Sequence, residues 1–281
     1  MKRTRSLFAF RLYLVPLAMM VGLALAIPAA ATNLNGFMPE RGHGDLAVSY
    51  TTEGYDQFWV GDVKVSDPGV GEVDIKSISA WLQWGLTDYL ALVVDAAYVD
   101  ASSDGLGGFE DSGLQDGSVL LKCRFLQSGP HSLVAALGVR TALSDYEANL
   151  PVDLGDNTTD MLVRLVYQAQ AGNFYFSQQV GYDVRGDDAP DDFPLYTELG
   201  YTFGRTTATI GYYQLIADGG TDIGDPGFTF PSNQDETTRL GLKLYARITD
   251  RFGFAVSGFD TLDGRNSGDT TGYSGTLVFK F

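Results

Sequence analysis

The sequence predicts an all-β protein, a transmembrane antiparallel up-and-down β-barrel of twelve strands. Three observations predict this fold. Apolar and polar residues alternate along most of the chain after residue 31, short turns alternate with long acidic segments, and the chain ends on an aromatic strand. An alternation with a period of two is typical of strands whose two faces meet different surroundings.

The beginning of the chain has the features of a cleaved secretory signal peptide. Basic residues among the first eleven precede an apolar run over residues 12–27, and small alanines follow at 29–31. This run is shorter than the ~20 residues that a transmembrane helix needs. We therefore predict a cleavable signal peptide over residues 1–31 and a single outer-membrane barrel domain over residues 32–281.

Twelve segments of the remaining chain show the two-residue alternation. The segment "TRLGLKLYARI" is the clearest, because Leu240, Leu242 and Leu244 fall on one face. Arg239 and Lys243 fall on the other face, and we find no comparable helical period after residue 31. The predicted strands cover residues 43–52, 75–86, 88–100, 117–127, 131–143, 159–170, 173–185, 194–203, 206–217, 237–248, 251–260 and 271–281.

Short turns and long loops alternate between these strands. Turns such as "WGLTDY", "AGNF" and "FGRT" contain the residues that tight turns favour, whereas six long segments hold 28 of the 35 acidic residues. Outer-membrane barrels have short periplasmic turns and long extracellular loops. A soluble sandwich could also hold twelve strands, but nothing in it would gather the acidic residues at one end. The predicted acidic rim either binds divalent cations that bridge lipopolysaccharide or is a solvated surface.

Aromatic residues cluster beside the short turns, as the interfacial girdle of a membrane barrel requires. These girdle candidates are Tyr89, Phe125, Phe174, Phe203, Phe252 and Phe281.

The last strand, "TGYSGTLVFKF", has one apolar face, which is formed by Tyr273, Leu277, Phe279 and Phe281. A membrane barrel must pair its last strand with its first, because lipid tolerates no unpaired strand edge. An aromatic C-terminal residue after alternating apolar positions also resembles the signal read by the machinery that assembles outer-membrane barrels. We therefore predict that these four residues are an assembly signal, and that the assembly machinery, outer-membrane lipid and lipopolysaccharide are partners.

Composition disfavours several other functions. A formal net charge of -16 does not suit nucleic acid, whose phosphates need Lys and Arg. The single Cys123 excludes a disulfide framework, and the isolated His43 and His131 give no metal-binding spacing. A lipid hydrolase would need a Ser and a His in a triad-like array, but His131 and Ser132 are neighbours and point to opposite faces of a strand. We expect no enzyme, cofactor or metal, and a lipid hydrolase is the remote alternative.

Charged residues on the strands are expected to face the lumen, because an Arg or Lys on the lipid face costs ~2–4 kcal/mol at the midplane. Twelve strands predict a narrow or partly plugged pore. The inward charges either form buried ion pairs that stiffen the barrel or give a lumen that attracts anions. The candidate lumen-lining and selectivity residues are Asp95, Lys122, Arg124, Arg140, Arg164, Glu198, Arg239, Lys243 and Arg247.

Three stretches resemble the outer-membrane family named for the MetA pathway of phenol degradation. They are "WLQWGLTDYLALVVDAAYV" at 81–99, "GLQDGSVLLKCRFL" at 113–126 and "GFMPERGHGDLAVSY" at 36–50. The second stretch departs from the family pattern, because Gln115 stands where Gly is expected before the Asp. The resemblance implies a twelve-strand barrel linked to the passage of small, often aromatic, compounds.

The sequence therefore favours a narrow channel or facilitator whose partner is a small amphipathic or aromatic solute. Arg239, Lys243 and Arg247 lie four residues apart on one face, about 13 Å at ~3.3 Å per residue, and predict a modest preference for anions. The alternative is a structural or surface-interaction barrel without an open pore, linked to exported polysaccharide.

Overall fold

The computed structural model describes residues 33–66, 69, 71–105, 108–146, 154–155, 157–186 and 188–281. The predicted signal peptide lies outside these residues. The described chain is all β, and none of it forms a helix that could cross a membrane. Its strands are β1 (Gly44–Tyr55), β2 (Phe58–Val60), β3 (Val63–Val65), β4 (Val73–Thr87), β5 (Leu90–Ser103), β6 (Phe109–Leu114), β7 (Asp116–Ser128), β8 (His131–Ala142), β9 (Thr159–Ala171), β10 (Phe174–Val184), β11 (Asp191–Phe203), β12 (Thr206–Asp218), β13 (Glu236–Arg247), β14 (Phe252–Arg265) and β15 (Thr271–Lys280).

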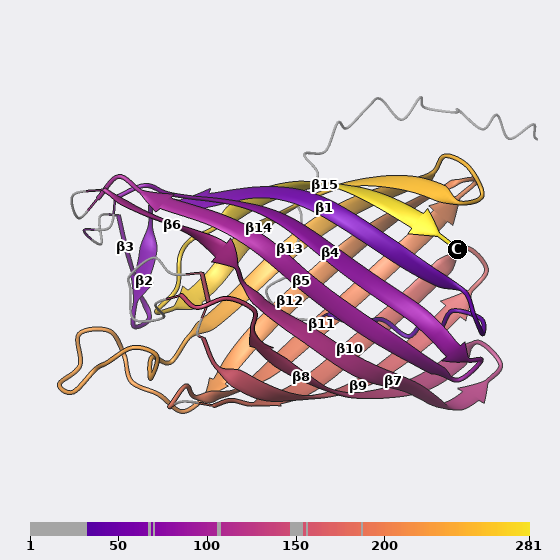
Figure 1. Ribbon diagram of the computed structural model, residues 1–281, viewed down its shortest axis with the longest axis horizontal. Coiled ribbons are helices and arrows are strands. Elements are labelled where there is room, and N and C mark those ends of the chain that lie inside the picture. Colours follow the sequence, from indigo (N-terminus) through magenta and orange to yellow (C-terminus); the bar gives the residue numbers. More distant parts are fainter. Residues whose placement is uncertain are drawn as a thin grey trace, which may run out of the picture.

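One closed antiparallel sheet forms the wall of a barrel (Figure 1). Consecutive strands pair from β7 to β15, β1 joins β15 to β4, and β4 pairs with β5. Both β6 and β7 pair with β5, over residues 98–103 and 90–95 of that strand, so together they occupy one position in the wall. The described chain therefore confirms the predicted twelve-strand up-and-down barrel.

The seam of the barrel joins the first wall strand to the last. Ten residue pairs connect β1 to β15. The N–H of Gly44 donates to the carbonyl of Phe281 at 2.9 Å, and the N–H of Phe281 donates to the carbonyl of Gly44 at 3.0 Å. The terminal residue thus completes the seam, and Tyr273, Leu277 and Phe281 are exposed on the outer face, with Phe279 half-buried.

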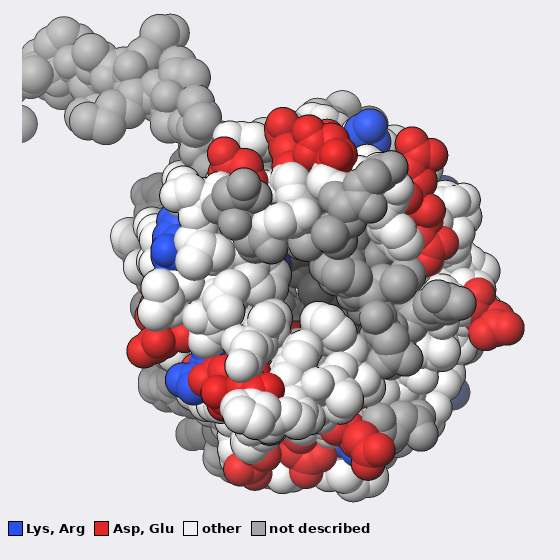
Figure 2. Space-filling view, turned by 90° about the vertical axis from the view of Figure 1, so that its left-hand side faces the viewer, with Lys and Arg blue, Asp and Glu red and all other residues white. Residues whose placement is uncertain are grey.

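The two ends of the barrel differ. At one end, which we call the short-turn end, two-residue turns join strands such as β9 and β10, and the C-terminus lies there (Figure 1). At the other, which we call the long-loop end, the β2–β3 hairpin and the segment 219–235 extend from the wall. Acidic side chains gather around this end, and only a few basic ones accompany them (Figure 2). The predicted separation of short turns from acidic loops is confirmed.

The outer wall is apolar. Large exposed side chains such as Val48, Leu137, Leu165, Ile210 and Leu244 project from it, which suits contact with lipid rather than water. The six girdle candidates are all exposed, five of them near short turns and Phe281 at the C-terminus.

Several strands run farther toward the long loops than the alternation of apolar residues indicates. β5 continues to Ser103 and β6 begins at Phe109, so much of the acidic segment 100–116 is a projecting hairpin rather than a loop. Above the membrane both faces of a strand meet water, so the apolar alternation stops before the backbone pairing does. Gln115 separates β6 from β7, and its N–H still donates to the carbonyl of Ala97 at 2.9 Å.

Candidate functional site

The lumen contains the N-terminal segment 33–43, which we call the plug. Leu34 in the plug is only 1% exposed, and Met38 and Trp81 pack against the same cluster of apolar side chains. The cluster projects inward from β5, β7, β8 and β9, and we call its wall residues the apolar half-wall. These residues are Val93, Leu120, Val134, Ala136, Leu162 and Val166.

Glutamine side chains bind the plug backbone. The N–H of Leu34 donates to Oε1 of Gln179 at 2.7 Å, and the N–H of Gly36 donates to Oε1 of Gln168 at 2.6 Å. Both glutamines are almost fully buried. A backbone donor left unpaired away from water costs ~1–3 kcal/mol, so these two bonds fix where the plug lies on β9 and β10.

Lys122 lies beneath the plug. Its fully buried ammonium donates to the carbonyl of Phe37 at 2.7 Å and to Oε1 of Gln83 at 2.8 Å. No carboxylate of the described chain lies within ion-pair distance of Lys122, so carbonyl oxygens solvate its charge. The structure therefore places this predicted selectivity residue where it holds the plug.

The opposite side of the lumen is lined by small polar residues. Ser49 and Thr276 share a hydrogen bond of 2.9 Å between their hydroxyls, and Ser257 and Ser274 share one of 3.1 Å. We call this side, on β12–β15 and β1, the hydroxyl half-wall. Its residues are Ser49, Thr51, Thr209, Gly211, Gly241, Ser257, Ser274 and Thr276.

The hydroxyl half-wall contains a small cavity. This cavity of about 60 Å³ is lined in part by Thr209, Gly211, Gly241 and Ser257. Its volume is that of about two waters. The cavity, and the absence among the described residues of any hydrogen bond from plug residues 33–41 to the hydroxyl half-wall, indicate that the plug leaves this side of the lumen largely uncovered.

Lys243 projects from the uncovered side. Its side chain is 43% exposed, and its ammonium lies 3.4 Å from Oε1 of the buried Glu198. Glu198 also accepts a hydrogen bond of 2.8 Å from the hydroxyl of Tyr196 and one of 3.4 Å from Nδ2 of Asn35 in the plug. Glu198 thus connects the plug to an accessible cation.

The other two cations of the predicted stripe lie on either side of Lys243 along β13. The guanidinium carbon of Arg239 lies 4.9 Å from the centre of the Phe259 ring, and its Nε has no hydrogen-bond partner among the described residues. Arg247 is exposed at the short-turn end. The stripe therefore runs along the wall from its long-loop half to the periplasmic rim expected for short turns.

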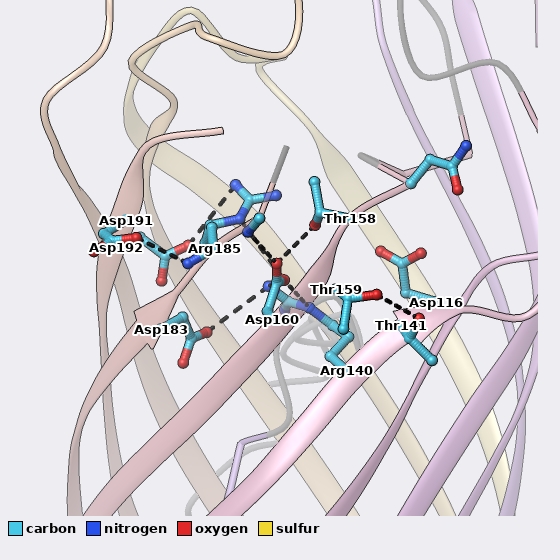
Figure 3. A network of polar contacts seen from close by, with 12 residues as sticks. Asp116, Arg140, Thr141, Thr158, Thr159, Asp160, Asp183, Arg185, Asp191 and Asp192 are labelled. Atoms are coloured by element: carbon cyan, nitrogen blue, oxygen red, sulfur yellow. Dashed lines mark hydrogen bonds and ion pairs between the residues drawn. The ribbon is translucent and has the colours of Figure 1, made fainter. Parts of the chain in front are cut away.

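A network of ion pairs lies on the inner face of the wall near the long-loop end of β8–β10 (Figure 3). Arg140 donates to Asp160 through Nε at 2.9 Å and Nη2 at 2.7 Å. Arg164 makes a bidentate pair with Asp183, whose second bond measures 2.9 Å. Arg140 also lies 3.8 Å from Asp183, and Arg185 lies 3.8 Å from Asp160. Arg140 and Arg164 are thus paired with carboxylates.

The remaining predicted residues lie apart from this network. Asp95 accepts a hydrogen bond from the hydroxyl of Ser118. Arg124 lies at the short-turn end, where its Nη2 donates to the backbone carbonyl of Asp88 at 2.7 Å. The nine predicted residues therefore do not form one site.

The sequence predicts that Lys122, Gln168 and Gln179 face inward, but it does not predict the plug that they bind or several partners in the network. Asp160, Arg185 and Asp192 belong to the ion-pair network, yet they lie where the strands merge into acidic loops. Gln83 is not among the predicted lumen-lining residues, although it is a polar residue at an inward position between Leu82 and Trp84. A buried polar residue beside an apolar cluster was the available signal that something else lies in the lumen.

The hydrogen-bond partners of the two histidine rings are not serines. Nδ1 of His131 lies 2.8 Å from the hydroxyl of Tyr167, and Nδ1 of His43 lies 3.2 Å from the carbonyl of Phe281. Within the part of the chain that the structure describes, no group of three or more His, Cys, Asp or Glu residues could hold a metal ion.

The family of the chain follows from a match to a family model. A family model described as "Putative MetA-pathway of phenol degradation" matches residues 62–277. The chain belongs to this family. The match begins after the plug and β1, covers the wall strands from β4 to β14, and ends within β15. None of the curated proteins compared with the chain matches it.

Solved structures show the same fold. The COG4313 outer membrane channel from Pseudomonas putida F1 matches with a TM-score of 0.71 at 17% identity, over 92% of this chain and 98% of that chain. The translocator domain of the autotransporter NalP from Neisseria meningitidis matches with a TM-score of 0.52 at 9% identity, over 87% and 90%. These matches show that the chain has the fold of outer-membrane β-barrels.

Proposed function

We propose that this protein is a narrow, plug-bearing outer-membrane channel for small amphipathic or aromatic solutes, with a modest preference for anions. The observation that carries the proposal is the uncovered hydroxyl half-wall with the accessible Lys243, facing a plug that covers the other side. The similarity to a barrel described as an outer membrane channel supports transport rather than catalysis.

The charges suggest which solutes pass. The acidic rim disfavours polyanions, although a Debye length of ~8 Å in physiological salt weakens this repulsion. A molecule with one carboxylate and one apolar ring meets less repulsion and can then interact with Arg239, Lys243 and Arg247. Rings of basic side chains select anions in other pores.

Reversal potentials in a salt gradient test the proposal. The wild-type protein is expected to prefer anions, and Arg239→Glu combined with Lys243→Glu is expected to abolish or reverse that preference. Lys243→Gln alone should produce a smaller shift in the same direction, because it removes one cation without adding an anion. Lys76→Gln is the matched control, since Lys76 is exposed on the outer face of β4. A channel that never opens, or a cation preference that the double substitution leaves unchanged, would contradict the proposal.

The plug and the ion-pair network favour a second candidate, a structural or surface-interaction barrel without an open pore. Paired Arg140 and Arg164 stiffen the wall without attracting solutes. In this case the bilayer experiment gives no current for the wild type, and the acidic rim becomes the functional surface, facing lipopolysaccharide or exported polysaccharide.

We also propose that the barrel assembly machinery reads the last strand. Phe281 closes the seam with its backbone while its ring stays exposed. Deleting Phe281 should lower the amount of folded, heat-modifiable protein in the membrane, because both the signal and two seam hydrogen bonds are lost. Phe252→Ala, which removes an exposed ring at the same end, should assemble normally. Wild-type assembly of the deletion variant would refute this role.

A further inference from the structure

A second cavity opens at the short-turn end, between the plug and the turn that joins β7 to β8. Its volume is about 260 Å³. The plug contributes Gly36, Phe37 and Met38 to its wall, and β7, β8 and β9 contribute polar side chains. Those that matter for its chemistry are Arg124, Gln127, Ser132 and Gln170.

Arg124 supplies the only full charge in the described wall of this cavity. Its Nη2 donates to the backbone carbonyl of Asp88 at 2.7 Å, which orients the guanidinium without neutralising it. No carboxylate of the described chain lies within ion-pair distance of Arg124. A guanidinium carries five N–H donors in a planar fork, so Arg124 keeps donors with the geometry that a carboxylate accepts.

The plug supplies an apolar side to the same cavity. The ring of Phe37 meets the ring of Tyr175 edge to face, with centres 5.0 Å apart at 73°, and this contact fixes its orientation. Met38 lies next to it in the cavity wall. Aromatic rings favour edge-to-face or offset stacking with one another, and a thioether also contacts rings favourably. The cavity therefore offers one charged side and one apolar side.

The volume limits what can bind. An apolar cavity of ~150 Å³ holds benzene, and drug-sized ligands occupy ~300–1,000 Å³. About 260 Å³ therefore accommodates one ring with a carboxylate and a little water, but not an oligosaccharide.

We propose that this cavity binds a small monocarboxylate that carries one apolar ring. The carboxylate pairs with the fork of Arg124, and the ring lies against Phe37 and Met38. The site deepens the proposed channel function, because a solute that passes the lumen would reach this cavity at the periplasmic side. Its role as an exit-side site rests on that function.

Equilibrium binding tests the site without requiring an open pore. The probe is benzoate, titrated calorimetrically into the folded full-chain barrel in detergent, with benzyl alcohol as the neutral counterpart. We expect saturable benzoate binding with a Kd of about 1 mM, typical of a small ligand with a single ion pair, and at least about tenfold weaker binding of benzyl alcohol.

Three variants locate the binding. Arg124→Gln should weaken benzoate binding at least about tenfold, and Arg124→Lys should restore part of it, because it returns the charge but not the fork. Arg205→Gln is the matched control: it makes the same charge change at the same end of the barrel, where Arg205 pairs with the exposed Asp250. Heat-modifiable mobility shows that each variant is folded.

The outcomes separate this site from the channel. Arg124-dependent benzoate binding in a barrel that passes no current would refute the channel and leave the site standing. A conducting barrel in which benzoate binding does not saturate, or is equal in wild type and folded Arg124→Gln, would overturn the site. Equal weakening by Arg205→Gln would also overturn it, since the effect would then be general electrostatics.

Discussion

The two sides of the lumen differ although the same alternating strands build both. Inward positions of the apolar half-wall carry Val, Leu and Ala, and the plug covers them. Inward positions of the hydroxyl half-wall carry Ser, Thr and Gly, and no hydrogen bond of the described chain joins them to the plug. The difference teaches that strand periodicity sets which residues face inward, whereas the chemistry of those residues decides which side is sealed.

Several weak contacts together keep the plug on its side. Ordering residues 33–43 costs conformational entropy, and the burial of Leu34 offsets only part of that cost. The hydrogen bonds that Gln168 and Gln179 accept from the plug, and the one that Lys122 donates to it, therefore add to the apolar contact.

The largest expected effect comes from removing the difference between the two sides. Deleting residues 33–38 should raise single-channel conductance severalfold, because it uncovers the apolar half-wall and widens the lumen. The strand ladder makes no use of these residues, so the variant should still show heat-modifiable mobility. Leu34→Ala is the milder companion and should increase brief openings. Unchanged conductance in a folded deletion variant would show that the plug does not limit the path.

Two lysines provide a sharper comparison. Lys122→Met removes the ammonium that holds the carbonyl of Phe37, so plug fluctuations and conductance should rise while ion preference stays the same. Lys243→Met removes the accessible cation of the hydroxyl half-wall, so anion preference should fall while conductance noise stays close to wild type. Single-channel recordings measure both quantities. If the two variants gave the same phenotype, the division of the lumen into two functional sides would be wrong.

The smallest expected effect concerns a group of hydrogen bonds over the long-loop end of the hydroxyl half-wall. We call this group, formed by Asp222, Arg265 and Asn266, the latch. The carboxylate of Asp222 accepts hydrogen bonds from Arg265 at 2.8 Å and Asn266 at 2.9 Å, and these bonds lower the pKa of Asp222. Oδ1 of Asn266 also accepts the N–H of Gly61 at 2.8 Å, which ties the β2–β3 hairpin to the latch. Because the folded pKa lies below the ordinary value of ~3.9, the latch is fully stabilised above that pH and weakens as pH falls through the lower value.

Emission from the buried Trp59 in the hairpin reports this loosening. It should shift to the red as pH falls below about 4, and Asp222→Asn should show part of the shift already at neutral pH. Asp225→Asn, an exposed change in the same loop, should behave as wild type. An acid response that Asp222→Asn leaves intact would assign the titration to another group.

The fold could be predicted because a membrane barrel repeats one signal twelve times. Leu240, Leu242 and Leu244 mark the lipid face of β13 without reference to any other strand. The seam was also predictable, because pairing the last strand with the first leaves no unpaired strand edge in the lipid. The resemblance to the family is confirmed over residues 62–277.

The plug and the charge pairing could not be predicted in the same way. Residues 33–43 have no periodicity, and their position depends on Gln168 and Gln179, which lie more than 130 residues later. Which cation meets which carboxylate depends on the stagger between neighbouring strands, which sequence alternation leaves open. Arg164 pairs with Asp183 while Lys243 stays accessible, although both are inward basic residues in similar strands.

The junction between plug and wall has a mechanical consequence. The N–H of Gly42 donates to the carbonyl of Gly85 at 2.7 Å, and the N–H of Gly85 donates to the carbonyl of His43 at 2.9 Å. A side chain at position 85 would collide with the carbonyl of Glu40, so this clamp requires a glycine. Tension applied to the plug is therefore carried into β4 before it reaches the bond between Gly44 and Phe281. We therefore expect that pulling on the plug loads β4 as well as the seam, where His43 also contacts the carbonyl of Phe281.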